Sequence, residues 1–98
     1  MSRQIYYLEI REMARIIDGE KKNLIGKNLK RLRTEKRISQ HALSARLELL
    51  GVYVCRGSVS RIEDHSRTVT DIELFAIAEV LGVSVAELYS NVWADKTV

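Results

Sequence analysis

Proline is absent from the 98 residues of this chain, and cysteine occurs only once. Without proline, nothing in the sequence marks a boundary between two domains, and the length suits one compact domain with a small core. A single cysteine, Cys55, excludes an internal disulfide. Because His41 and His65 stand alone in the sequence, no metal-binding cluster is indicated either.

Long apolar runs and glycine-rich loops are also missing. Charged residues at positions 9, 11, 12 and 15 interrupt the apolar residues near the N-terminus, so this segment is neither a signal peptide nor a membrane span. The chain has no phosphate-cradling glycine loop, no paired carboxylate motif, and no assembled nucleophile and base. We therefore expect a cytoplasmic protein that is not an enzyme and needs no cofactor.

The net charge of +3 is modest, but the charges are unevenly placed. Between Leu24 and Arg37 six lysines and arginines accompany one acidic residue, whereas acidic residues predominate after Arg67. A basic surface attracts polyanions such as nucleic acid, although many basic helix faces are merely solvated. The charge pattern alone does not decide between these two interpretations.

Helical periodicity and capping signals predict five helices and no strand in the body of the chain. The first helix is expected from a cap at Asn23 to about Arg37. The second is expected from a cap at Ser39 to Gly51. Its buried stripe consists of Leu43, Leu47 and Leu50.

Two capping boxes predict the fourth and fifth helices, Thr70 with Glu73 and Ser84 with Glu87. The string IELFAIAEVL (residues 72–81) between them is apolar almost all round. This composition indicates a central buried helix, closed by the glycine that follows it.

The third helix, over residues 55–64, has two contrasting faces. Cys55, Val59 and Ile62 share one face by their spacing, which we expect to be core. The opposite face collects Gly57, Ser60, Arg61 and Asp64, with Arg56 and Ser58 at its flanks. Such a helix fits the major groove of B-form DNA, where small residues permit close approach and arginine makes two hydrogen bonds to guanine.

From Leu24 to about Tyr89 the sequence resembles the Cro/cI-type (XRE) helix-turn-helix family of phage and bacterial transcriptional regulators. The matching strings are IGKNLKRLR, ISQHALSARL, SVSRIE and LFAIAEVLGVSVAELY, in this order. The resemblance implies an all-α, five-helix, lambda-repressor-like DNA-binding domain over residues 24–90, with an N-terminal extension at 1–23 and a tail at 91–98. It also implies a repressor rather than an activator, which binds a palindromic operator in double-stranded DNA as a homodimer, without cofactor or metal.

The family pattern assigns DNA contacts to particular positions. Gln40 is similar to the family glutamine that fixes the start of the second helix against a phosphate. Gly57 departs from the pattern, because a longer side chain often stands there, and Arg56 and Arg61 are therefore the expected specificity residues. The full set expected to contact DNA is Lys30, Gln40, Arg56, Gly57, Ser58, Ser60, Arg61 and Arg67.

The family pattern also pairs Arg33, late in the first helix, with Glu63, which ends the string SRIE. Both residues flank apolar positions of their helices. We expect a partly buried ion pair that joins the first and third helices and orients the recognition helix without touching DNA.

The string ELLGVYV makes the turn before the third helix longer than the common form of the family, which indicates a subgroup. Val52 and Val54 are expected to point inward and Tyr53 outward, where its ring either contacts the DNA backbone or packs within the loop. Cys55 stands where the family usually has a capping serine, threonine or aspartate. It is either an apolar packing residue or a redox or metal switch at the helix N-terminus.

The N-terminal extension lies outside the resemblance. Its apolar residues recur at helical spacing in Tyr6, Ile10, Met13 and Ile17. Residues 4–17 are therefore expected to form an amphipathic helix, although alternation at positions 6, 8 and 10 also fits a strand. The extension either covers part of the domain or, in our preferred interpretation, pairs with its copy in a dimer. The alternative function is an antitoxin-like or other subunit that holds a protein partner through this extension and also binds DNA.

Overall fold

The structure is a computed structural model that describes residues 20–92. Five α-helices and no strand occur in this part of the chain, which confirms the all-α prediction. The helices are α2 (Gly26–Glu35), α3 (Gln40–Leu49), α4 (Arg56–Glu63), α5 (Asp71–Leu81) and α6 (Val85–Leu88). The helix or strand expected within residues 4–17 lies outside the described residues.

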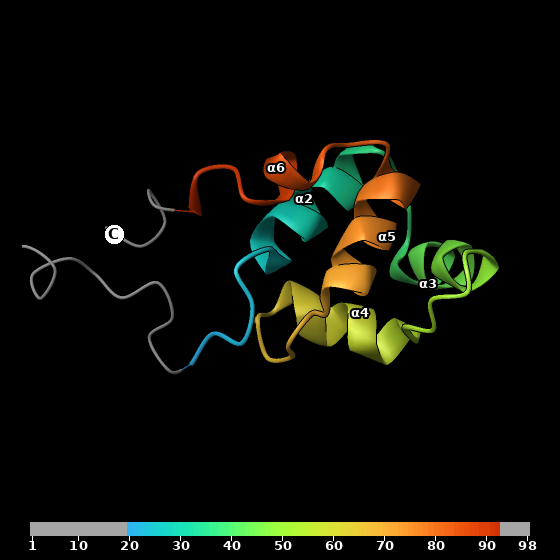
Figure 1. The fold of residues 1–98 in the computed structure, drawn as a ribbon, viewed down its shortest axis with the longest axis horizontal. Helices are drawn as coiled ribbons and strands as arrows, with labels where there is room; N and C mark the ends of the chain where they lie inside the picture. Colours follow the sequence, from blue (N-terminus) through green and yellow to red (C-terminus); the bar gives the residue numbers. More distant parts are fainter. Residues whose placement is uncertain (1–19, 93–98) are drawn as a thin grey trace, which may run out of the picture.

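The helices enclose one apolar core (Figure 1). The contacts in the described chain join α3 to α4 and α5, α2 to α4 and α6, and α5 to α6. The core side chains are Ile25, Leu29, Leu32, Ile38, Leu43, Leu47, Val54, Val59, Ile62, Ala76, Ile77, Ala78, Leu81 and Leu88.

None of the helices within residues 20–92 is long and apolar enough to span a bilayer.

Capping signals in the sequence place three helix starts correctly. The Ser39 hydroxyl accepts a hydrogen bond from the Ala42 N–H at 2.9 Å, which caps α3. Both predicted capping boxes, at the starts of α5 and α6, are present. Because each satisfies two backbone N–H groups that a helix start leaves without partners, the local sequence fixes these boundaries.

The end of α3 confirms the glycine stop and corrects one expected core residue. Gly51 has a left-handed φ of 80°, and the Val52 N–H donates to the Leu47 carbonyl at 3.0 Å. This bond and the left-handed glycine form a Schellman motif. Leu50, expected in the buried stripe, is 55% exposed. Val52 and Val54, which follow in the turn, pack against the core at this end.

The start of α2 differs from the prediction. The helix begins at Gly26, not at a cap on Asn23. The Asn23 side chain is buried and accepts hydrogen bonds from the N–H groups of Ile25 and Gly26 at 3.1 and 2.9 Å. Its amide nitrogen donates to the carbonyls of Ile62 and Arg67 at 3.0 and 2.7 Å. Asn23 therefore connects the start of α2 to the end of α4 in place of a simple cap.

A glycine permits the close approach of these two helices. A Cβ added at Gly26 would overlap with the carbonyl oxygen of Ile62 and lie 2.9 Å from that of Glu63. The first turn of α2 therefore rests directly on the backbone that ends α4. Any larger residue at this position would push the two helices apart.

The prediction that α5 is a central buried helix is wrong for one of its faces. Ala76, Ile77 and Leu81 are buried, but Ile72 is 68% and Phe75 is 62% exposed. The described helices cover α5 on the side of the core and leave this apolar face open. Periodicity shows which residues are apolar, but not how many sides of a helix its neighbours cover.

The expected ion pair between α2 and α4 is present. The Arg33 Nε and Nη2 atoms donate to the two carboxylate oxygens of Glu63 at 2.5 and 3.0 Å. Arg33 Nη1 donates to the Ile38 carbonyl at 2.7 Å, and Gln40 Nε2 donates to Glu63 Oε1 at 3.0 Å. The side chains of the pair are 10% and 4% exposed, and every buried side-chain nitrogen and oxygen within the described chain has a partner.

We predict that Arg33→Ala and Glu63→Ala each lower the free energy of unfolding by on the order of 3 kcal/mol, because each leaves a buried charge without its partner. Urea denaturation measures this loss. The exposed pair of Arg31 and Glu35 is the control, and Arg31→Ala should cost less than about 1 kcal/mol. Unchanged unfolding midpoints for both Arg33→Ala and Glu63→Ala would contradict the structural importance of the pair.

We predict that the same substitution has opposite effects at two glycines. Gly26→Ala should destabilise the protein by about 1–3 kcal/mol, because the new methyl group overlaps with the end of α4. Gly57→Ala in α4 should raise stability by as much as about 1 kcal/mol, because its Cβ meets its nearest neighbour at an ordinary 3.5 Å. Thermal melts of the two variants measure the difference. Equal shifts in melting temperature would show that the α2–α4 approach is not tight.

Candidate nucleic-acid interface

Helix α4 presents a polar face to solvent and an apolar face to the core. Val59 and Ile62 are buried, which fixes the orientation of the helix on the domain. The residues expected to meet DNA lie on its other side, where Arg56, Gly57, Ser60 and Arg61 are exposed and Ser58 is half-buried. The structure therefore places these five predicted site residues on one accessible helix.

Hydrogen bonds along α4 connect its start to Arg61. The Cys55 thiol donates to the Ser58 hydroxyl at 3.4 Å, and Arg61 Nη2 donates to the same hydroxyl at 3.0 Å. The guanidinium of Arg61 is therefore drawn back toward the N-terminal end of the helix. Arg56, in contrast, makes no hydrogen bond or ion pair within residues 20–92 and extends freely from the first turn.

Cys55 corrects the prediction of a core residue. It is exposed and is the N-cap of α4, with an extended backbone (φ −68°, ψ 164°). Helical spacing does not apply to a residue outside the helix, so its side chain does not follow Val59 and Ile62 into the core. Hydrogen bonding with the side chain and backbone of Ser58, followed by that with the Gly57 backbone and the charge of Arg61, lowers the pKa of the thiol.

The turn before α4 confirms the predicted alternation. Val54 is buried and Val52 is partly buried, whereas Tyr53 is 77% exposed. The interpretation of Tyr53 as a tyrosine packed within its loop is therefore wrong.

Gln40 lies at the first position of α3, as predicted, but its side-chain amide is hydrogen-bonded within the protein. The amide donates to Glu63, beside the ion pair with Arg33. Gln40 therefore joins the start of α3 to the end of α4. Its expected contact with a DNA phosphate stays a prediction.

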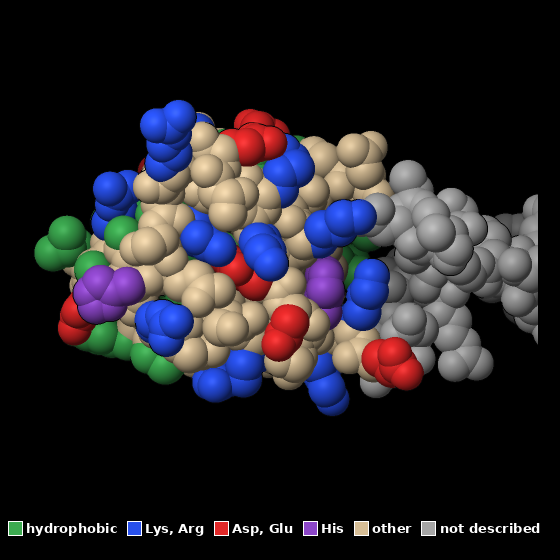
Figure 2. Space-filling model, turned by 180° about the vertical axis from the view of Figure 1, so that it is seen from behind, with side chains coloured by type: hydrophobic (Ala, Val, Ile, Leu, Met, Phe, Trp, Pro, Cys, Tyr) green, Lys and Arg blue, Asp and Glu red, His purple; other side chains and the backbone are tan. Residues whose placement is uncertain are grey.

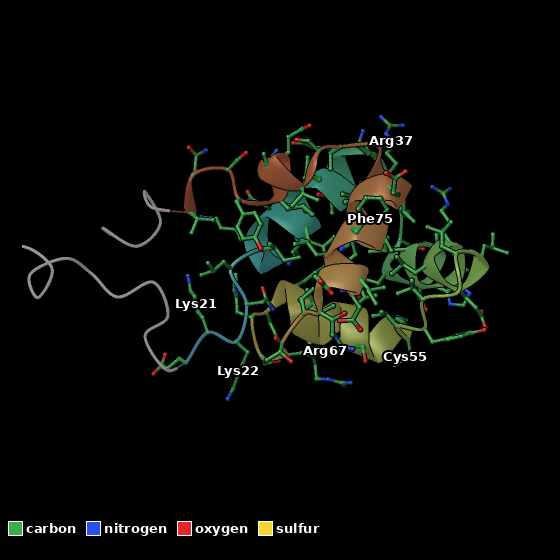
Figure 3. All side chains as sticks on the ribbon, viewed as in Figure 1. Lys21, Lys22, Arg37, Cys55, Arg67 and Phe75 are labelled. Carbon is green, nitrogen blue, oxygen red and sulfur yellow. The ribbon has the colours of Figure 1, made fainter. Side chains whose placement is uncertain are left out.

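Arg67 has a partner that the sequence did not reveal. Its two Nη atoms donate to the carboxylate oxygens of Glu73 at 3.0 and 2.8 Å, and Nη1 also donates to the Thr68 carbonyl. The hydrogen bonds from Arg67 lower the pKa of Glu73 and are the largest cause of this shift. Arg67 thus ties the loop after α4 to the start of α5 (Figure 3), and a DNA phosphate would compete with Glu73 for its guanidinium.

The surroundings of α4 are basic. Figure 2 shows Lys and Arg side chains distributed over the side of the molecule that is formed by α2, α3 and α4. Lys30 is exposed on α2 and has no hydrogen bond or ion pair to α4. Among the described residues, no three His, Cys, Asp or Glu side chains form a group that would hold a metal ion.

A second buried asparagine escaped the sequence analysis. Asn28 in α2 donates to the carbonyls of Leu88 and Ser90, both at 2.8 Å, and so holds the end of α6. A polar residue beside the apolar Leu29 was the available signal, but its distant partners cannot be read from local spacing.

Comparisons with known proteins agree with this arrangement. A family model described as helix-turn-helix matches residues 29–88. The chain is also similar to a solved structure, the restriction-modification controller protein C.AhdI from Aeromonas hydrophila, with 29% sequence identity and a TM-score of 0.58. That similarity covers 66% of this chain and 91% of the controller protein. A search of curated proteins finds no match. Since the family model covers more than half of the chain, the protein belongs to the Cro/cI-type (XRE) helix-turn-helix family of DNA-binding transcriptional regulators.

Proposed function

We propose that the protein is a repressor that binds a palindromic operator as a homodimer, with α4 of each subunit in the major groove. The domain responsible spans residues 24–90 and belongs to a subgroup with a lengthened turn before α4. The observation that carries the proposal is the accessible face of α4, which combines Arg56 and Arg61 with the small residues Gly57 and Ser60. Small side chains let the helix approach the base edges closely, and the arginines provide donors for guanine.

The two arginines differ in how their side chains are held before DNA binds. Arg61 is held toward the helix start by Ser58, so its donors are oriented before DNA arrives. Arg56 is unconstrained and orders on binding. Preorganisation reduces the entropy lost by a side chain in the complex, so Arg61 supplies the more selective contact.

The remaining expected contacts position the domain on the DNA backbone. Lys30 contributes charge from α2, and the first turn of α3 offers its N–H groups near Gln40. Arg67 contributes less, because it must share its guanidinium with Glu73. In a homodimer, two such domains would place their α4 helices about 34 Å apart, one turn of B-form DNA.

The similarity to a restriction-modification controller protein supports a role in gene control. Footprinting on the DNA upstream of its own gene and of the neighbouring genes identifies the operator. A two-fold symmetric footprint is the expected result, and sedimentation of the complex gives the number of subunits. A single protected half-site, bound by one subunit, would contradict the dimer.

We predict that Arg56→Ala and Arg61→Ala each cost about 1–3 kcal/mol of operator binding and relax the preference at one base position. Lys30→Ala, the matched control, should weaken binding to operator and random DNA alike, because phosphate contacts carry no sequence information. Fluorescence anisotropy with both DNAs at fixed salt measures the affinities. Equal losses on operator and random DNA for the two arginine variants would exclude them as specificity residues.

We predict that Ser58 acts mainly through Arg61. Ser58→Ala removes the hydroxyl that orients the guanidinium, and it should reduce operator affinity by less than Arg61→Ala does. In an Arg61→Ala background, Ser58→Ala should then have no further effect, and a double-mutant cycle measures this coupling. If the loss persists in that background, Ser58 contacts DNA itself.

A further inference from the structure

The exposed face of α5 forms one wall of an apolar hollow. Asp71, Ile72, Leu74, Phe75 and Val85 line this hollow, which has a volume of about 420 Å³. Ile72 and Phe75 are each more than half exposed in it. Large apolar side chains gathered in one open patch are typical of a contact surface.

A second hollow, of about 380 Å³, continues the first toward the N-terminus of the described chain. Its lining is Lys22, Asn23, Leu24, Ile25, Thr68, Val69, Thr70, Asp71, Leu74 and Tyr89. The two hollows share the lining residues Asp71 and Leu74, so they adjoin on the surface between Lys22 and Phe75. We call the two hollows together the α5 groove. Figure 3 shows Phe75 on α5 and the segment with Lys21 and Lys22 that leads to α2.

The chain itself leads into the α5 groove. The backbone N–H of Lys22 donates to the His65 carbonyl at 2.7 Å, and this bond fixes the segment before α2 at one end of the groove. Residues 1–19 precede this point directly. Fully extended, they would span about 60 Å, whereas α5 with its 11 residues is about 16 Å long. The segment is therefore long enough to follow the groove to its far end.

The composition of residues 1–19 complements the α5 groove. The segment carries the large apolar residues Ile5, Tyr6, Tyr7, Leu8, Ile10, Met13, Ile16 and Ile17. Its charges balance, with Arg3, Arg11 and Arg15 against Glu9, Glu12 and Asp18, so we expect apolar contact to dominate. Apolar surface is thus available on both sides of the contact.

We propose that residues 1–19 dock in the α5 groove of their own chain and cover Ile72 and Phe75, in place of the pairing between copies that we preferred from the sequence alone. A tethered segment has an effective concentration in the millimolar range, well above the micromolar concentrations at which a second copy would compete. The N-terminal extension then completes the domain by sealing α5, and α4 stays accessible. This inference concerns a different surface from the DNA interface and does not depend on the proposed function.

Disulfide trapping in the full-length chain tests the proposal. In a Cys55→Ser background, Met13→Cys is combined with Glu79→Cys, an exposed position one turn beyond Phe75 on α5. The matched control combines Met13→Cys with Glu48→Cys, which is also an exposed glutamate but lies on α3. Oxidised glutathione starts the reaction at micromolar protein, and non-reducing electrophoresis with peptide mass analysis identifies the products. The expected result is an intramolecular disulfide that forms at least tenfold faster in the Glu79 pair than in the Glu48 pair.

A second variant separates docking from mere tethering. Ile72→Ser with Phe75→Ser, both exposed in the described chain, should leave the helical circular dichroism unchanged and abolish the rate advantage of the Glu79 pair. Equal rates for the two pairs would overturn the proposal. So would an advantage that survives the serine substitutions, or a disulfide-linked dimer as the main product, which would assign the α5 groove to a second copy.

Discussion

The orientation of the recognition helix depends on the buried contact between Arg33 and Glu63. Because the pair is buried, the loss of either partner is strongly destabilising. A charge in the interior is tolerated only when its hydrogen-bonding groups have partners. Here Arg33 donates a further hydrogen bond to the Ile38 carbonyl, and Glu63 accepts a further one from the Gln40 amide. The Glu63 carboxylate at the end of α4 thus joins α2 to the start of α3, and Arg33 adds the loop after α2. The far end of α4, where Arg56 lies, carries no such restraint.

The parts of the fold that could be predicted are those in which neighbouring residues hold all the information. Ser39, Thr70 and Ser84 mark helix starts because the donors they satisfy lie within three residues. Gly82 marks the end of α5 for a similar reason, since its left-handed φ of 66° suits a residue without a side chain. The accessible face of α4 follows from its helical period. The ion pair was available from a family pattern and from its position beside apolar residues.

The features that escaped prediction are contacts between distant segments, or places where a helix stops. Asn23 resembles an N-cap in sequence, but its partners include a carbonyl 39 residues away. Arg67 looks like a free cation, because the loop that brings it to Glu73 has no periodicity. Cys55 was assigned to a helical face that begins only after it. The exposure of Phe75 depends on which neighbours cover α5, and no local pattern records that.

The lack of a side chain at Gly57 has a consequence for how such a regulator diversifies. The backbone there has an ordinary helical conformation, and a side chain would meet little besides the end of Arg61. Neither the core nor the ion pair behind α4 would have to adjust. In the complex with DNA that we propose, position 57 would thus be a place where a mutation introduces a preference for another base pair while the scaffold stays intact.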